Sequence, residues 1–196
     1  DTVPYGFYRR EIFDRLGGLD ERLVRAQDYE FNRRIITAGG KILRNPQIRI
    51  RYFNQPTLSA FYKKQVVKEA PYNAYLWYLA PYAFAARHAV TGLFATGVLG
   101  GLLLSSFSNW IALPYAAVMT LYIVLAVLSG LQQAVRYRKP LHAILLPFCF
   151  VLYHFIHGIG ILWGLLRLAA GTAPVQQTEE PWPGAGYHRW SPSTSK

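Results

Sequence analysis

The sequence has no acidic residue between positions 71 and 170, although acids are frequent before that stretch. Its single cysteine, Cys149, excludes an internal disulfide and a zinc site built from several cysteines. The triplet Asp-x-Asp does not occur in the chain, and no secretory signal opens it. Residues 1–4 read like the middle of a domain, so we expect the chain to be a fragment of a longer protein.

The charge balance is strongly basic, with 21 Lys and Arg against 10 Asp and Glu and a net charge of +11. Basic residues in the first seventy positions are interleaved with acids, and the others flank apolar stretches. This placement is typical of a protein at an anionic membrane surface rather than in a nucleic-acid groove. We therefore expect membrane lipids, and no nucleic acid, among the partners.

A charge-free stretch runs from position 89 to position 135, which is long enough for a helical hairpin because one membrane span needs roughly 20 apolar residues. The pattern predicts helices at about 89–107 and 111–131, and a third at about 142–166, within a membrane segment at 89–168. A buried helix of a soluble protein is seldom apolar on all faces for this length. The sequence therefore predicts a multi-pass membrane protein.

Basic residues at the edges of these stretches indicate the orientation. Arg87 precedes the first span and residues 136–139 follow the second, so both ends of the hairpin and the preceding residues should be cytoplasmic. Arg167 ends the third stretch, which leaves a full crossing and a re-entrant or tilted segment both open.

Two segments border the spans. Residues 71–88 are rich in Tyr, Trp and Phe, which predicts an amphipathic helix in the membrane interface. Its aromatic rings either set its depth or line a path for a lipid-linked acceptor. Residues 169–196 contain much Pro, Gly, Ser and Thr and are expected to be a flexible tail.

Small and polar residues recur in the third stretch. The spacing of Gly160 and Gly164 permits close helix contact. His154 and His157 share a helix face, and we expect them to be hydrogen-bonded inside the bundle; a metal or proton-relay role is the alternative.

The first seventy residues show a mixed α/β pattern. Helices are predicted at 10–16, ended by Gly17, and at 30–36 with a start near Gln27. Alternating apolar residues predict strands at 41–43 and 47–52. A unit of this size cannot easily form a full core alone, so residues 1–70 should end a larger α/β domain.

Asp28 is the leading candidate for a catalytic residue. The N-terminus of its predicted helix favours a negative charge, and Glu30 and Arg34 follow on the same helix. An ionised Asp can act as a general base for a hydroxyl within hydrogen-bond reach. The alternative is an ordinary acid in the first turn of a helix.

Several motifs occur in an order that resembles family 2 glycosyltransferases, and more narrowly bacterial exopolysaccharide enzymes of the succinoglycan type. In chain order they are DTVPYGFYRREIF at 1–13, GGLDERL at 17–23, QDYEFNRR at 27–34, AGGKI at 38–42 and, more loosely, HFIHGIG at 154–160. The resemblance implies that residues 1–70 are the C-terminal, acceptor-side part of a GT-A catalytic domain.

The resemblance also implies roles for particular residues. The family uses a Glu-Asp pair whose Asp is the base, and this Asp falls on Asp28, with Gln27 in place of the preceding acid. Arg34 matches an Arg that follows on the same helix, and Glu30 lies between them as a further substrate-binding candidate. Processive members carry Gln-x-x-Arg-Trp, of which Gln65 and Lys68 keep the spacing without the Trp.

The function implied is that of a membrane-bound, inverting glycosyltransferase of the hexosyl type in the bacterial inner membrane. It would transfer a sugar from a nucleotide-sugar donor to a lipid-linked glycan acceptor in exopolysaccharide synthesis. Mg²⁺ or Mn²⁺ is expected in the intact enzyme, but its Asp-x-Asp ligand motif is absent here, so no metal ligand is assigned in this chain and the fragment alone should be inactive. The alternative is a non-catalytic membrane module that anchors or assembles a polysaccharide export complex.

Overall fold

The computed structural model describes residues 6–175. The predictions made for residues 1–5, and for positions 176–196 of the tail, therefore lie outside the described residues. The elements are α1 (Arg10–Leu16), α2 (Gln27–Thr37), α3 (Leu58–Lys64), a π-helical segment η1 (Gln65–Glu69), α4 (Ala70–Leu79), a 3₁₀ turn η2 (Pro81–Ala83), α5 (Ala86–Ser105), α6 (Asn109–Tyr137) and α7 (His142–Ala169).

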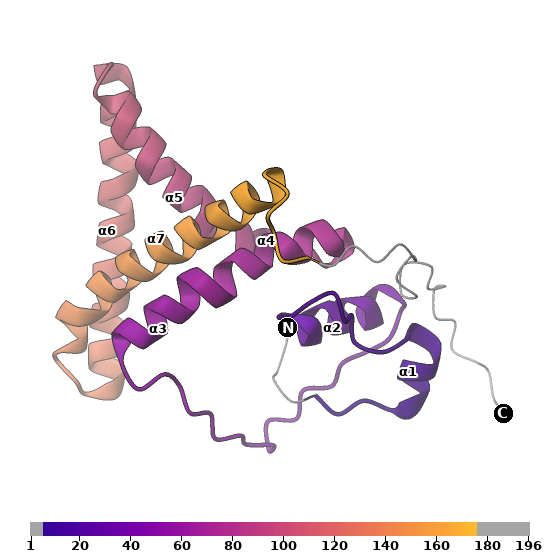
Figure 1. Ribbon diagram of the computed structural model, residues 1–196. Coiled ribbons are helices and arrows are strands. Elements are labelled where there is room, and N and C mark those ends of the chain that lie inside the picture. Colours follow the sequence, from indigo (N-terminus) through magenta and orange to yellow (C-terminus); the bar gives the residue numbers. More distant parts are fainter. Residues whose placement is uncertain (1–5, 176–196) are drawn as a thin grey trace.

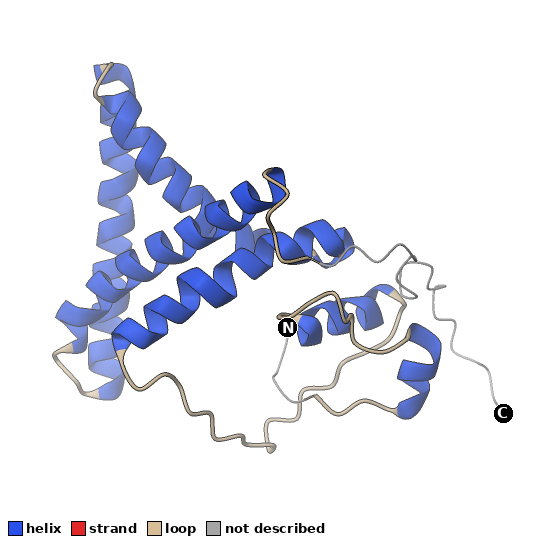
Figure 2. Ribbon diagram, in the orientation of Figure 1, coloured by secondary structure: helices blue, strands red, loops and turns tan. Residues whose placement is uncertain are grey.

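The predicted strands at 41–43 and 47–52 are wrong, because both segments lie in an irregular, exposed connection between α2 and α3. The described part of the chain contains no strand, as Figure 2 shows. A strand needs a neighbour to pair its backbone N–H and C=O groups, and residues 6–57 offer no second extended segment aligned for pairing. The α/β part of a GT-A domain expected from the sequence is therefore not seen.

The first two helices agree with the predicted positions. Helix α1 ends at Gly17, whose φ of 76° is the left-handed backbone that glycine adopts without strain. The aromatic rings of Phe13 and Phe31 stack at 5.0 Å between the two helices, beside buried Leu16 and Ile35. This small core fixes the position of α2.

Helices α3 and α4 form one rod, with η1 between them, that lies along α7 in the same direction (Figure 1). The hydroxyl of Tyr62 donates to the carbonyl of Cys149 at 3.1 Å near the start of the rod. A Cβ added at Gly160 would lie 2.6 Å from the Cβ of Ala70. The contact line between the rod and α7, called the seam below, therefore uses the Gly160 and Gly164 spacing that was expected to permit close helix contact.

Among residues 6–175, three helices are long and apolar enough to cross a membrane: α5, α6 and α7. Helices α5 and α6 form a hairpin turned at residues 106–108, and α6 continues six residues beyond the predicted end at 131. Large apolar side chains on both helices face outward, including Leu93 at 70% and Leu113 at 76% exposure. Lipid chains are the solvent that covers such surfaces without a free-energy cost.

Helix α7 crosses the hairpin diagonally rather than running along it, as its contacts show in order (Figure 1). Its start packs on α6, where Pro147 fills the space beside Gly130. Its middle packs on the first turns of α5, with Gly158 against Thr91. Its last third packs on α4, so the end of α7 lies beside the segment that precedes the hairpin.

Candidate functional site

Asp28 lies in the first turn of α2 with a half-buried side chain. Its Oδ1 accepts a hydrogen bond from the backbone N–H of Tyr29 at 2.9 Å. Tyr8 lies near it, and the pKa of Tyr8 is raised by burial first and by the negative charge of Asp28 second. The Tyr8 hydroxyl donates to Oδ1 of Asn32, one turn after Asp28, at 3.0 Å. Asp28 is thus a partly exposed carboxylate on the Tyr8 side of α2.

The backbone that leads into α2 is strained at Ala26. This residue has φ of 63° and ψ of 20°, a left-handed conformation that costs a residue with a Cβ about 1–2 kcal/mol. Its carbonyl accepts the N–H of Glu30 at 2.9 Å, which closes the first turn of the helix. The sharp entry turns the chain so that Gln27 and Asp28 open the helix.

Glu30 and Arg34 form a fully buried ion pair on α2, each with 0% side-chain exposure. Nε of Arg34 donates to Oε1 of Glu30 at 2.8 Å and Nη2 donates to Oε2 at 2.6 Å. The same guanidinium donates to the carbonyls of Leu16 at 2.6 Å and Gly18 at 2.9 Å. Because a buried charge is costly unless it is paired, this pair locks α2 onto the turn after α1.

Tyr82, in η2, links the Glu30–Arg34 pair to the segment that precedes the apolar helices. Its hydroxyl donates to Oε1 of Glu30 at 2.5 Å. Burial raises the pKa of Tyr82, and the bond to Glu30 raises it further, so the phenol stays neutral and remains a donor. Glu30 therefore connects α2 to the segment just before the hairpin.

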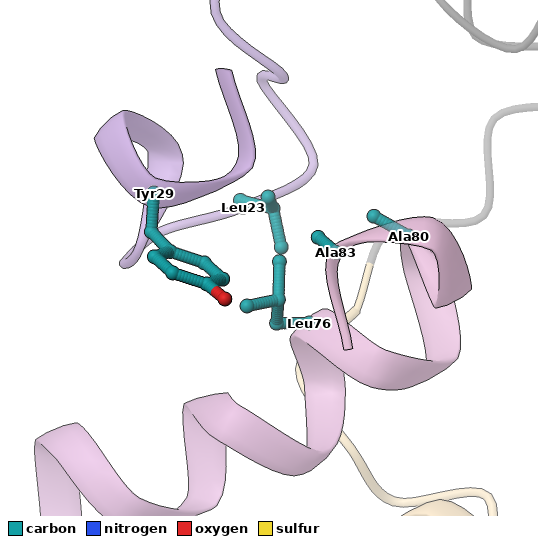
Figure 3. Close-up of a cluster of buried hydrophobic side chains, with 5 residues drawn as sticks. All are labelled: Leu23, Tyr29, Leu76, Ala80 and Ala83. Atoms are coloured by element: carbon teal, nitrogen blue, oxygen red, sulfur yellow. The ribbon is translucent and has the colours of Figure 1, made fainter. Parts of the chain in front are cut away.

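A second buried pair supports the same connection. Asp20 is fully buried, and Arg22 donates to both of its carboxylate oxygens, at 3.0 Å from Nε and 2.7 Å from Nη2. Arg22 also donates to the carbonyl of Leu79 at the end of α4, at 3.3 Å. An apolar cluster lies between the same elements, formed by Leu23, Tyr29, Leu76, Ala80 and Ala83 (Figure 3).

The start of α2 also contacts η1 and α5. Nη1 of Arg25 lies 2.9 Å from Oε1 of Glu69, which Lys64 approaches to 3.2 Å. The ring of Tyr29 lies 4.9 Å from the ring of His88 in the first turn of α5. In the sequence, Asp28 therefore lies between Arg25, which contacts η1, and Tyr29, which contacts the first turn of α5.

The sequence-predicted site residues fall into two groups. Glu30 and Arg34 are brought together in the buried pair, where each already has partners. Gln27 and Gln65 are half-buried on different elements, and Lys68 is exposed on η1. The assignment of all five as substrate-binding residues stays a prediction. The assignment of Asp28 as the base also stays a prediction.

The residues that hold the site together were not found from the sequence. Tyr82 lies in a run of aromatics that the pattern assigned to the membrane interface, and no periodicity connects position 82 to position 30. Asp20 and Arg22 lie in the GGLDERL motif, which carried the resemblance but was given no role. The sequence did carry a signal for this pair, because opposite charges two positions apart in a turn can bond directly.

His154 and His157, in α7, are hydrogen-bonded inside the bundle, which confirms the structural interpretation. Nδ1 of His154 lies 2.7 Å from the hydroxyl of Tyr122 on α6. Nδ1 of His157 lies 2.9 Å from Oγ1 of Thr91 on α5. Each histidine thus joins α7 to a different helix of the hairpin.

A divalent metal finds no ligand set in the part of the chain that the structure describes. Among residues 6–175, no three His, Cys, Asp or Glu side chains gather closely enough to hold an ion. We therefore derive no chemical step through a metal, and the Mg²⁺ or Mn²⁺ expected from the resemblance stays a prediction about the intact enzyme.

Comparison with known proteins gives one curated relative. The chain is 24% identical over 177 residues to a dolichyl N-acetyl-α-D-glucosaminyl phosphate 3-β-D-2,3-diacetamido-2,3-dideoxy-β-D-glucuronosyltransferase of Methanococcus voltae. The match covers 85% of this chain and 48% of the relative, so the chain spans about half of the relative's length. Neither a protein family nor a solved structure matches the chain. The similarity supports a glycosyltransferase, and the three apolar helices support a membrane protein.

Proposed function

We propose that this chain is the acceptor-side and membrane part of a glycosyltransferase that elongates a lipid-linked glycan. The observation that carries the proposal is the similarity to a transferase whose named acceptor is a dolichyl-linked sugar phosphate. That similarity covers most of this chain, including the three apolar helices. The finer assignments are also proposals: family 2, hexosyl transfer, exopolysaccharide synthesis, and a bacterial inner membrane with residues 1–88 in the cytoplasm.

Asp28 is the proposed general base. It would take the proton of an acceptor hydroxyl as the hydroxyl oxygen bonds to the anomeric carbon of the donor sugar. The bond between that carbon and the phosphate oxygen breaks, and the nucleoside diphosphate leaves with the electron pair. Attack from the opposite face inverts the anomeric centre. The half-buried carboxylate lies in the first turn of α2, a position where helices commonly carry acidic side chains.

Glu30 and Arg34 act in this proposal as positioning residues for Asp28. Their buried bonds, together with Tyr82, fix α2 relative to the segment before the hairpin. Gln27, Gln65 and Lys68 remain candidates for contacts with the glycan, since they lie on elements joined by the Arg25–Glu69 pair.

The position of Asp28 fits an acceptor held in a membrane. The ring of Tyr29, the residue after Asp28, contacts His88 in the first turn of α5, so the start of α2 lies beside the end of the hairpin. A glycan carried on a membrane lipid would present its hydroxyl groups at this level.

The test is the variant Asp28→Asn in the intact protein in its membrane. Asn keeps the shape of the side chain but cannot take a proton, so we expect release of nucleoside diphosphate with lipid acceptor to fall by at least about 100-fold. The matched control is Asp14→Asn on α1, whose carboxylate is exposed and 3.9 Å from Arg10, and it should keep wild-type activity. Near-normal transfer by a folded Asp28→Asn protein would remove Asp28 from the mechanism. Absence of transfer by the wild type with every nucleotide sugar tried would favour the non-catalytic module.

A further inference from the structure

A cavity of about 250 Å³ lies between η1, α4 and α7, and Asp28 is not among the residues that line it. Apolar and aromatic side chains form most of its wall, among them Val66, Tyr72 and Trp163. Arg167 provides its positive charge. Ligand pockets are commonly about 300–1,000 Å³, so this one has room for a head group and a few carbons rather than for a whole lipid.

Tyr75 also lines the wall, and it is the most deeply buried of the polar side chains there. Only 2% of this residue is exposed, and within the described residues its hydroxyl has no hydrogen-bond partner. Burial raises the pKa of Tyr75, while the charge of Arg167 and the approach of its guanidinium to the phenol oxygen act in the opposite direction. A guanidinium cannot accept a hydrogen bond, so the neutral phenol O–H still lacks an acceptor. A buried donor without an acceptor is unfavourable, and an acceptor atom from a ligand would remove that cost.

Arg167 has donors to spare for such a ligand. A guanidinium carries five N–H donors, and one of those on Arg167 goes to the carbonyl of Thr172. Guanidinium groups suit phosphate because they can donate two parallel bonds to its oxygens. A phosphate could thus bond to Arg167 and Tyr75 together.

The position of the cavity indicates which kind of molecule would carry this phosphate. The last third of α7 packs on α4, which precedes the hairpin, so the cavity lies at the end of the apolar helices. Lipid phosphates lie at that level of a bilayer, with their chains against apolar helix surfaces such as exposed Leu166. We propose that this cavity binds the phosphate end of a membrane lipid, through Arg167 and Tyr75.

Two lipids share this chemistry: an isoprenoid phosphate, which could be the carrier of the acceptor glycan, and an ordinary anionic phospholipid. The site is independent of Asp28, so it is tested by binding rather than by sugar transfer. The probes are farnesyl phosphate, farnesol with the same chain but no phosphate, and short-chain phosphatidylglycerol, each titrated against the full chain in detergent.

We expect farnesyl phosphate to bind at least about tenfold more tightly than farnesol, as one charge-assisted hydrogen bond would give. Arg167→Gln should abolish that preference, and Tyr75→Phe should weaken it several-fold without changing the shape of the side chain. The matched control is Arg136→Gln, at the end of α6, which lies outside the cavity and should leave binding unchanged.

Equal binding of farnesyl phosphate and farnesol would overturn the proposal, as would an unchanged preference in both variants. If Arg167→Gln does not fold, the Tyr75→Phe protein decides the question alone. Phosphatidylglycerol that competes as well as farnesyl phosphate would support the site and identify it as one for structural lipid. Loss of transfer in Asp28→Asn with normal farnesyl phosphate binding would show that the two sites fail separately.

Discussion

Residues 6–40 and residues 86–169 bury different kinds of side chain. The first region hides charges: Asp20, Glu30 and Arg34 are among its least exposed side chains. The second hides small residues and His157, while most of its large apolar side chains point outward. The buried charges of the first region are stabilised by their hydrogen bonds to one another and to the backbone, whereas lipid solvates the apolar surface of the second. Tyr82 and Arg22 connect the first region to the segment that precedes the second.

The difference predicts which substitutions matter most in each region. In the first region, loss of one member of a charge pair leaves the other buried without a partner. In the second, added volume at a glycine contact forces helices apart. Loss of one hydrogen bond between these helices costs less free energy than either of those changes.

The largest effect is expected for Arg34→Met, which leaves the buried carboxylate of Glu30 without its cation. We expect the opening free energy of α2, measured by hydrogen exchange of its amides, to fall by about 3–5 kcal/mol. Arg44→Met, in the exposed connection, is the matched control and should change little. The double variant Glu30→Gln, Arg34→Met should recover part of the loss; if Arg34→Met costs no more than Arg44→Met, the buried pair does not stabilise α2.

An intermediate effect is expected for Gly160→Ala. The new Cβ would lie 2.6 Å from the Cβ of Ala70 and 3.0 Å from the carbonyl oxygen of Val66, so α4 and α7 must separate at a cost of about 1–3 kcal/mol.

The control for this seam is Gly100→Ala on α5, where nothing lies within 4 Å of the new Cβ. Since alanine favours helix over glycine by up to about 1 kcal/mol, this variant should be neutral or slightly stabilising. Thermal denaturation of both variants in the same detergent measures the difference. A melting temperature for Gly160→Ala at or above that of Gly100→Ala would contradict the close contact.

The smallest effect is expected for Thr91→Val, which removes the hydrogen bond to His157 but keeps the shape of the side chain. Bonds between membrane helices are worth about 0.6 kcal/mol on average, so the melting temperature should fall by only a few degrees. A loss as large as that for Arg34→Met would erase the contrast between the two regions.

The sequence predicted the helices well because their signals are local. The start of α2 near Gln27 and the end of α1 at Gly17 follow from residues a few positions apart. The apolar helices follow from charge-free length. Their observed bounds differ by a few residues from those predicted, because charge-free length does not mark where a helix ends; α6, for example, continues past Arg136 to Tyr137.

The prediction of strands failed because a strand depends on a neighbouring strand, which a local sequence pattern cannot supply. Ile48 and Ile50 alternate as strand residues do, yet they lie exposed in an irregular segment. The buried hydrogen bonds of Glu30 were not predicted for a related reason, since Tyr82 lies 52 positions from Glu30 in the sequence. Asp28 itself was located correctly at a helix start, while its chemical role came from a resemblance and awaits its test.

The π-helical segment η1 has a geometric consequence for the seam between the rod and α7. Tyr62, Val66, Ala70 and Ala74 all meet α7, and each follows the last by four positions. In a regular α-helix, steps of four turn by about 40° each, so the fourth residue would have rotated about 120° away from the first. The wider turn of η1 takes up the excess residue and resets the phase of the rod. One straight seam is thereby kept over the whole length of α3 and α4, and deletion of a single residue from η1 would turn one half of it away from α7.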